Sequence, residues 1–301
     1  MRITQRAVST TSLAGLNQNL AAIGKLQEQL TSGKSISKPS DSPTGTNRSM
    51  QTRSESAANE QFGRNITDGK SWLDTTDSTL MRMGEVGRRV RDLTVQGNNT
   101  GANSVASRAA IRSEVEQIAE GMIALANNQL GGRPIFGGVT SGDRAYDTTG
   151  AFIGRAVTAA EPEGINRRIS EIETVRIDVT GPEAFGEQGV GQRDLFQIVK
   201  DIAVHVTDDP TLLAADLTAL DEALVRMSNA QSVIGARASR VEIAKSINTD
   251  ASLTLQNLLA ETENVDLPRT IMELKMQETG YEAALSATAQ VIRPTLVDFL
   301  R

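Results

Sequence analysis

Apolar residues recur at alternating steps of three and four near both ends of the chain, and this heptad spacing most constrains the fold. The N-terminal seam consists of Leu13, Leu16, Leu20, Ile23 and Leu30, with Gln27 as its one polar member. The C-terminal seam consists of Leu274, Tyr281, Leu285, Ile292 and Phe299. Such seams are narrower than the apolar stripe of an ordinary globular helix and are typical of coiled coils. We therefore predict a long helix at each end of the chain.

The same periodicity runs through much of the interior. From about residue 41 to 96 the sequence stays helical in character, which corresponds to roughly 80 Å of helix. Its predicted apolar face is Phe62, Ile66, Leu73, Leu80, Met83 and Val90. Two further heptad runs comprise Ile111, Val115, Ile118, Met122 and Leu125, and then Leu217, Leu220, Leu224, Met227, Ile234 and Val241. These runs predict helical arms on both sides of the middle of the chain.

A polar break, "TSGKSISKPSDSPT", occupies residues 31–44 between two helical segments. Its prolines restrict the backbone and cannot lie inside a helix without removing a hydrogen bond. Asp41 or Ser42 can cap the next helix, with Pro43 in its first turn, where a missing N–H costs nothing. We therefore predict a stiff connection at this point.

The middle of the chain, from 131 to 191, changes to glycine-rich breaks around short alternating runs. In "ETVRIDVTG", Val175, Ile177 and Val179 alternate with polar residues, a period of two that indicates a strand. The predicted fold class is mainly α with a small β-rich insertion (α+β). Long, coiled-coil-like arms from both termini pair antiparallel, and the β domain lies at their far end.

Composition and charge exclude several classes of function. Aromatic residues make up only 3%, and the formal net charge is −6, so the chain offers neither stacking platforms nor a basic field for nucleic acid. Cysteine is absent, which excludes disulfides and thiolate metal sites. We find no signal-peptide core and no run of 18 apolar residues, so membrane insertion is not expected and export would need another route.

Candidate catalytic residues are few. His205 is the one histidine, and it lies on a predicted amphipathic helix, so a structural role is expected. The stretch "GRNITDGKS" at 63–71 spaces its glycines wrongly for a phosphate-binding loop and follows no strand. We therefore predict no enzymatic activity, no cofactor and no metal site.

Periodicity alone leaves two uses of the seams open. They can pack together inside one chain as a helical bundle, because heptads mostly signal core. They can instead remain partly uncovered in the single chain and pair with other copies of it.

Several quoted segments resemble the flagellin superfamily. They are "MRIT" at the start, "QLTSGKSISKPSDSPTG" at 29–45, "LANNQLGGRPIFGG" at 125–138, "GPEAFG" at 181–186, "VDLPRTIMELKMQETGYEAALSATAQ" from 265, and the terminal "LVDFLR". Their order along the chain matches that of the superfamily over essentially the whole length. "GRPIFGG" and "LVDFLR" favour the members that join the flagellar hook to the filament over filament flagellins.

The resemblance implies three domains. The terminal helices, 1–42 plus 265–301, correspond to an assembly domain called D0, and 43–132 plus 192–264 correspond to a helical rod called D1. Residues 133–191 correspond to a β-rich outer domain. The break then becomes the joint between D0 and D1, with Gly33, Pro39, Asp41 and Pro43 as its key residues. The two terminal seams become surfaces between subunits.

The resemblance also implies location and partners. It predicts secretion through the flagellar type III export apparatus to the extracellular flagellum, at the hook–filament junction, where the chain would template flagellin polymerisation. The implied partners are other copies of the chain, hook-associated protein 1, flagellin and an export chaperone. Filament flagellin is the alternative, and a cytoplasmic coiled-coil scaffold a further one. Pro294 departs from the helical pattern and is expected to kink or end the last helix.

Overall fold

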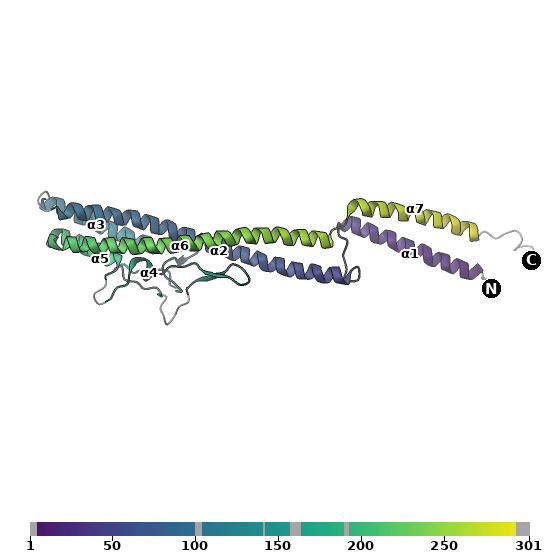
Figure 1. Cartoon of the computed structure of the whole chain (residues 1–301), viewed down its shortest axis with the longest axis horizontal. Helices are drawn as coiled ribbons and strands as arrows, with labels where there is room; N and C mark the ends of the chain where they lie inside the picture. The colour runs from purple at the N-terminus through teal and green to yellow at the C-terminus, as the bar shows by residue number, and fades with distance from the viewer. Residues whose placement is uncertain (1–4, 100–103, 141, 157–163, 190–192, 293–301) are drawn as a thin grey trace, which may run out of the picture. The chain divides into compact units, whose positions relative to one another are not determined.

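The computed structural model describes residues 5–99, 104–140, 142–156, 164–189 and 193–292 (Figure 1). Its helices are α1 (Gln5–Ser32), α2 (Pro43–Asn98), α3 (Val105–Ala126), α4 (Gly181–Phe185), α5 (Leu195–Asp208), the 3₁₀ turn η1 (Pro210–Leu212), α6 (Leu213–Glu263) and α7 (Leu267–Ile292). Its strands are β1 (Gln129–Leu130), β2 (Arg133–Pro134), β3 (Asn166–Arg168) and β4 (Thr174–Arg176). None of the helices in these ranges has the length and hydropathy needed to cross a membrane.

The chain forms two compact units. Unit 1 comprises 1–58 and 251–301, and unit 2 comprises 59–250. Unit 1 thus contains α1, α7, the predicted joint, the first turns of α2 and the last turns of α6. Helices α2 and α6 each contribute to both units. The domain boundaries expected near 42 and 265 fall at breaks between helices inside unit 1, and they stay a prediction.

Proline positions explain where the long helices begin. Pro43 is the first residue of α2 and Pro268 the second of α7. At these places the missing N–H would have had no partner inside the helix. The remaining 55 residues of α2 contain no proline, so the predicted long helix can run through the segment without interruption. The predicted helix at 41–96 is therefore confirmed almost to the residue.

Helices α2 and α6 pair antiparallel in unit 2. The side-chain amide of Asn59 donates to the Asn248 carbonyl, and the side-chain amide of Asn248 donates to Asn59 Oδ1 at 2.7 Å. Further along, Arg91 Nε lies 2.7 Å from Asp221 Oδ1. Gly87 lets the helices approach closely, because a Cβ there would lie 2.5 Å from Leu224 Cδ2. Most residues of the predicted apolar faces are buried, namely Ile66, Leu73, Leu80, Met83, Val90, Leu220, Met227, Ile234 and Val241, whereas Phe62, Leu217 and Leu224 are half-buried.

Helices α3 and α5 pack on each other and complete the helical part of unit 2. Both begin at a side-chain cap: Ser104 Oγ accepts from Ser107 N at 3.2 Å, and Asp194 Oδ1 accepts from Gln197 N at 2.8 Å. Such caps satisfy donors that the first turn leaves without an intrahelical partner. Two buried faces then meet, and α5 alone buries Leu195, Phe196, Ile198, Val199, Ile202, Ala203 and Val206.

The β-rich insertion contains little regular strand. Two separate antiparallel ribbons pair β1 with β2 and β3 with β4, the latter with Arg167 opposite Val175. Val175, Ile177 and Val179 are buried as the alternation predicted, although only Val175 lies within a strand. Aromatic rings form a cluster in this core, and Phe185 lies 4.9 Å from Phe136 and 5.4 Å from Phe196, measured between ring centroids. The few aromatic residues of the chain are thus concentrated where regular structure is short.

The insertion lies against the sides of α2 and α6 in unit 2 (Figure 1). Arg167 Nε binds Asp68 of α2 at 2.6 Å, and Arg237 of α6 donates to the Asp178 carbonyl at 2.7 Å. Because both anchors lie inside the helices and not at their ends, the β3–β4 ribbon is held alongside the helical pair of unit 2.

In unit 1, α1 and α7 lie side by side and antiparallel (Figure 1). Gln277 Nε2 donates to Asn19 Oδ1 at 3.2 Å, and Val265 N donates to the Gly33 carbonyl at 3.1 Å. The end of α1 is therefore next to the start of α7. The predicted pairing of the terminal arms is confirmed.

Phe185→Ala tests the role of the aromatic core. Phe185 is fully buried between Phe136, Tyr146 and Phe196. The cavity left by the substitution should lower the free energy of unfolding by about 3–5 kcal/mol. Urea unfolding followed by circular dichroism measures the loss. Val105→Ala, at a side chain that is 86% exposed, is the control and should change little; equal stability of the two variants would contradict the packing described.

Candidate assembly surface and interhelical joint

The N-terminal seam is divided between two environments. Ile23 is 9% exposed, and Leu16 and Leu30 are half-buried, so the row with seven-residue spacing at 16, 23 and 30 packs within the unit. Leu13 and Leu20 form the other row and are 54% and 53% exposed. In a coiled coil both rows of a heptad are covered by a partner helix. Two of the five apolar residues of this seam therefore stay exposed to solvent in the single chain.

The C-terminal seam is divided in the same way. Leu274 and Tyr281 are half-buried, whereas Leu285 is exposed. Ile292 is the last residue of α7, and Phe299, like Pro294, lies outside the described residues. The structure thus brings the described members of both seams onto one antiparallel helix pair.

Heptad spacing missed the most exposed apolar residues of α7. Met272 and Met276 are 66% and 69% exposed, whereas Ile271, which is also exposed, does follow the heptad spacing. Methionine is flexible and polarizable, which suits surfaces that adapt to a partner. The available signal was the step of four between the two methionines, which places them on one face of a helix but outside the heptad row. Ile271 lies two heptads before Leu285 on the same face of α7, whereas the two methionines lie on the opposite face. The exposed members of the two seams, Leu13, Leu20, Ile271 and Leu285, form what we call the terminal apolar surface.

The predicted joint is built around a reversal of the chain after α1. Gly33 ends α1 with a φ of 67°, in the left-handed region that glycine adopts without strain. Its carbonyl accepts from Val265 N, while Ser35 N donates to the Glu263 carbonyl at 2.7 Å. These two hydrogen bonds tie the joint to the connection between α6 and α7.

Glu263 is the electrostatic centre of the joint, and sequence reasoning did not find it. Its side chain is 7% exposed and binds Arg53 through two hydrogen bonds, Nε to Oε1 at 2.9 Å and Nη2 to Oε2 at 2.7 Å. Lys34 Nζ lies 3.1 Å from Oε2, and the Ser49 hydroxyl donates to Oε1. The hydrogen bond from Arg53, followed by those from Ser49 and Lys34, lowers the pKa of Glu263 to about 2 against the cost of burial. The Glu263 carboxylate of α6 is thus bound both to α2 and to the loop that follows α1.

Asp41 organises the loop itself, not the following helix. Its carboxylate binds Lys25 at 3.0 Å and accepts the backbone N–H groups of Lys38 and Ser37 at 3.0 and 3.2 Å. The Lys25 hydrogen bond, followed by the two backbone hydrogen bonds, lowers the pKa of Asp41 to about 2. Of the two predicted caps, Ser42 is the one used, since its Oγ accepts from Gly45 N at 3.1 Å.

The two prolines of the joint have different positions. Pro43 starts α2, as predicted, and Pro39 lies exposed in the turn before it. A fixed φ at both positions limits the conformations that the connection can sample. The joint is therefore both tied by ion pairs and stiffened by its backbone.

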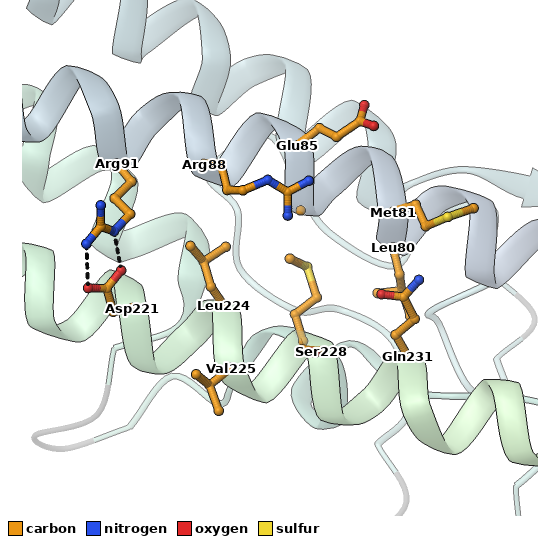
Figure 2. Close-up of a pocket in the computed structure, with 12 residues that line it drawn as sticks. Leu80, Met81, Glu85, Arg88, Arg91, Asp221, Leu224, Val225, Ser228 and Gln231 are labelled. Carbon is orange, nitrogen blue, oxygen red and sulfur yellow. Dashed lines mark hydrogen bonds and ion pairs between the residues drawn. The ribbon is translucent and has the colours of Figure 1, made fainter.

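A groove of about 530 Å³ lies between α2 and α6 in unit 2 (Figure 2). Leu80, Met81, Leu224 and Val225 contribute apolar walls. Figure 2 shows Arg91 and Asp221 facing each other across the groove, joined by the ion pair of the α2–α6 pair. The groove is thus part of the packing between α2 and α6, with apolar walls and an ion pair at its edge.

The single histidine lies elsewhere in unit 2. His205 Nδ1 is 2.5 Å from Asp216 Oδ2, and the other oxygen of Asp216 accepts from Arg193 Nη1 at 2.8 Å. Asp216 is nearly fully buried, so its charge requires these partners. His205 therefore joins α5 to the start of α6, which fits the structural role expected of it.

Glu263→Gln tests the joint. The pKa of this carboxyl is lowered from 4.5 to about 2, so its contribution is complete above pH 4.5 and is lost as the pH falls through about 2. The substitution should destabilise the joint by about 1–3 kcal/mol at neutral pH. It should also remove the dependence of the joint's stability on pH between about 2 and 4.5. Amide hydrogen exchange at Ser35 and Val265 measures both effects.

Glu261→Gln is the matched control, because Glu261 is exposed on the same helix. Exchange rates at Ser35 and Val265 in this variant should equal those of the unaltered chain. If Glu263→Gln left the exchange rates unchanged as well, the ion-pair cluster would not hold the joint.

Comparison with known proteins extends over most of the chain. Residues 3–140 match the family model described as the bacterial flagellin N-terminal helical region. Flagellin of Bacillus subtilis is 25% identical over 96% of both chains. Flagellar hook-associated protein 3 of Salmonella typhimurium is 22% identical over 94% of this chain and 95% of its own.

The fold is also shared with solved structures. The flagellar junction protein FlgL of Legionella pneumophila aligns with a TM-score of 0.56 over 73% of this chain and 99% of its own, at 14% identity. At that identity the structural match speaks for the fold alone. The family match and the relatives of near-equal length show that the chain is similar to proteins of the flagellin superfamily over nearly its whole length, with residues 3–140 matching the N-terminal helical region.

Proposed function

We propose that the chain is a structural subunit of the bacterial flagellum, located at the junction between hook and filament, where it templates flagellin polymerisation. The observation that carries this proposal is the terminal apolar surface. Helices α1 and α7 pair within the chain and still leave Leu13, Leu20, Ile271 and Leu285 exposed. A helix pair that hides one row of each seam and exposes the other is suited to a partner that covers the second row.

The partner that fits this surface best is another copy of the chain. Exposed apolar patches on soluble proteins mark interaction sites. Arg269 and Lys275 beside the surface form ion pairs with Glu273 and Glu278 of the same helix, so the charges next to it are already neutralised. Contacts between copies would then depend on apolar packing, which suits a surface repeated in every subunit of an assembly.

Two observations favour the junction over the filament. The segments "GRPIFGG" and "LVDFLR" resemble the superfamily members that join hook to filament. Relatives named hook-associated protein 3 also align with nearly the whole chain. Filament flagellin is the second candidate, because the Bacillus subtilis flagellin is similar at 25% identity over the same length. The copy number separates the two, since a junction needs few copies and a filament thousands.

The remaining partners follow from the proposed position. Hook-associated protein 1 would lie below the subunits and flagellin above them. An export chaperone would bind the chain before its secretion through the flagellar type III apparatus, and the assembled protein would be extracellular. A cytoplasmic coiled-coil scaffold would share the heptads but would have no reason to carry the flagellin motifs at both ends.

Leu20→Asp and Leu285→Asp test the assembly role. Both side chains are exposed in the single chain, so the folded monomer should lose little stability. In the assembly each carboxylate would have to be desolvated or would hold the subunits apart, at a cost of several kcal/mol that recurs at every subunit. Cells carrying either variant as their only copy should show hooks without filaments and release flagellin into the medium. Electron microscopy and analysis of the medium measure these outcomes.

Ala21→Asp is the matched control, because Ala21 is exposed next to Leu20 but outside both rows of the seam. It should support normal filaments. All variants must be exported at the same level, which immunoblotting of the medium checks. Normal filaments with Leu20→Asp and Leu285→Asp would overturn the seam assignment, and filaments on cells that lack the protein would overturn the junction role.

A further inference from the structure

The turn between β3 and β4 exposes an isoleucine to solvent. Ile172 is 96% exposed, and no other large apolar side chain in the described ranges is more exposed. Glu171 before it has no ion pair in the part of the chain that the structure describes, whereas Glu173 after it binds Arg240 at 2.7 Å. An apolar residue beside a free carboxylate is therefore displayed at the tip of this hairpin.

The hairpin is held firmly although its tip is exposed. Arg167 binds Asp68 of α2, and Asn65 Nδ2 donates to the Arg168 carbonyl at 2.8 Å. The turn is closed by the hydrogen bond from Ile169 N to the Glu173 carbonyl at 3.0 Å. Together with the Glu173–Arg240 pair, these contacts fix the hairpin to both α2 and α6. These contacts therefore hold the hairpin in a conformation that keeps Ile172 exposed.

A second feature of unit 2 is complementary to this tip. A groove of about 750 Å³ runs between α2 and α6, with Gly63, Ile66, Thr67, Ser71, Asn248 and Thr249 among its lining residues. Its small side chains leave space for a knob of isoleucine size. Its charged lining residues are Glu60, Arg64, Asp68 and Lys245. Asp68 is paired with Arg167, whereas Arg64, Lys245 and Glu60 have no ion pair among the described residues. The groove therefore offers an excess of positive charge to the free Glu171.

The tip and the groove lie at the same level of the helical pair. The hairpin is anchored at Asn65 and Asp68 of α2, and the groove is lined by α2 residues from Glu60 to Ser71. In a contact between the tip of one copy and the groove of the next, the two copies would therefore lie side by side, without an offset along the helices.

We propose that the β3–β4 hairpin of one copy docks into the α2–α6 groove of a neighbouring copy, with Ile172 inserted between the helices and Glu171 facing Arg64 and Lys245. The inference rests on the proposed assembly function and adds a second surface to it. Each copy gives its hairpin to one neighbour and its groove to the other, which is a heterologous contact. Since successive copies stay level, repeating the contact generates a ring when the rotation closes.

Cysteine cross-linking in isolated flagella tests this contact, because the chain has no cysteine of its own. Cells would express two single variants together, Ile172→Cys and Thr67→Cys, with Thr67 exposed in the groove. Mild oxidation should give a disulfide-linked heterodimer. The control pair is Ile172→Cys with Val105→Cys, whose position at the start of α3 is equally accessible but outside the groove. The heterodimer should be several-fold more abundant in the first pair than in the control.

Charge exchange provides a second test that does not depend on the cysteine variants. Lys245→Glu should reduce incorporation into flagella, and adding Glu171→Lys in the same chain should restore it. The docking is wrong if the heterodimer does not exceed the control while both variants are present in flagella, or if Glu171→Lys fails to restore incorporation. Absence of every variant and of the unaltered chain from flagella would instead overturn the proposed function.

Discussion

The structure depends on pairing between segments from opposite ends of the sequence. In unit 1, α1 pairs with α7, and in unit 2, α2 pairs with α6 through contacts such as the reciprocal amides of Asn59 and Asn248. Closing such long loops costs conformational entropy, which local contacts cannot offset. Burial along continuous apolar faces and the bidentate Glu263–Arg53 ion pair offset it. The middle of the chain, held between the arms, is then free to form an insertion.

Sequence periodicity predicted these helices well because burial follows the heptad directly. Leu80, Met83 and Ile234 lie in the core where the pattern placed them, and the long helix from about 41 to 96 is present as α2. The joint was predicted as a break, but its centre was not. Glu263 is separated from Arg53 by 210 residues, and no local pattern relates them. The β-rich part was harder still, because the rings of Phe136, Phe185 and Phe196, which meet in its core, come from a loop and two separate helices that no local pattern relates.

The residues of the candidate assembly surface were likewise predicted only in part. The heptad identified Leu13 and Leu20 together with Leu16 and Ile23, but it could not tell which row the chain itself would cover. Only the α1–α7 pairing separates them, and the exposed row then becomes the candidate contact between copies. This division has a physical advantage, since one row packs within the chain while the other stays available as an apolar surface for assembly. The joint beside it, stiffened by Pro39 and tied by Glu263, limits the conformations of the connection.

The central claim is that the exposed row of the terminal helices becomes buried between copies. The most direct measurement is the reactivity of a thiol in place of Leu20, which is 53% exposed in the single chain. Maleimide labelling of Leu20→Cys should be fast in the purified monomer and strongly suppressed in isolated flagella, since the chain contains no other thiol. Equal labelling in the two states would show that this row faces solvent in the assembly and would contradict the account.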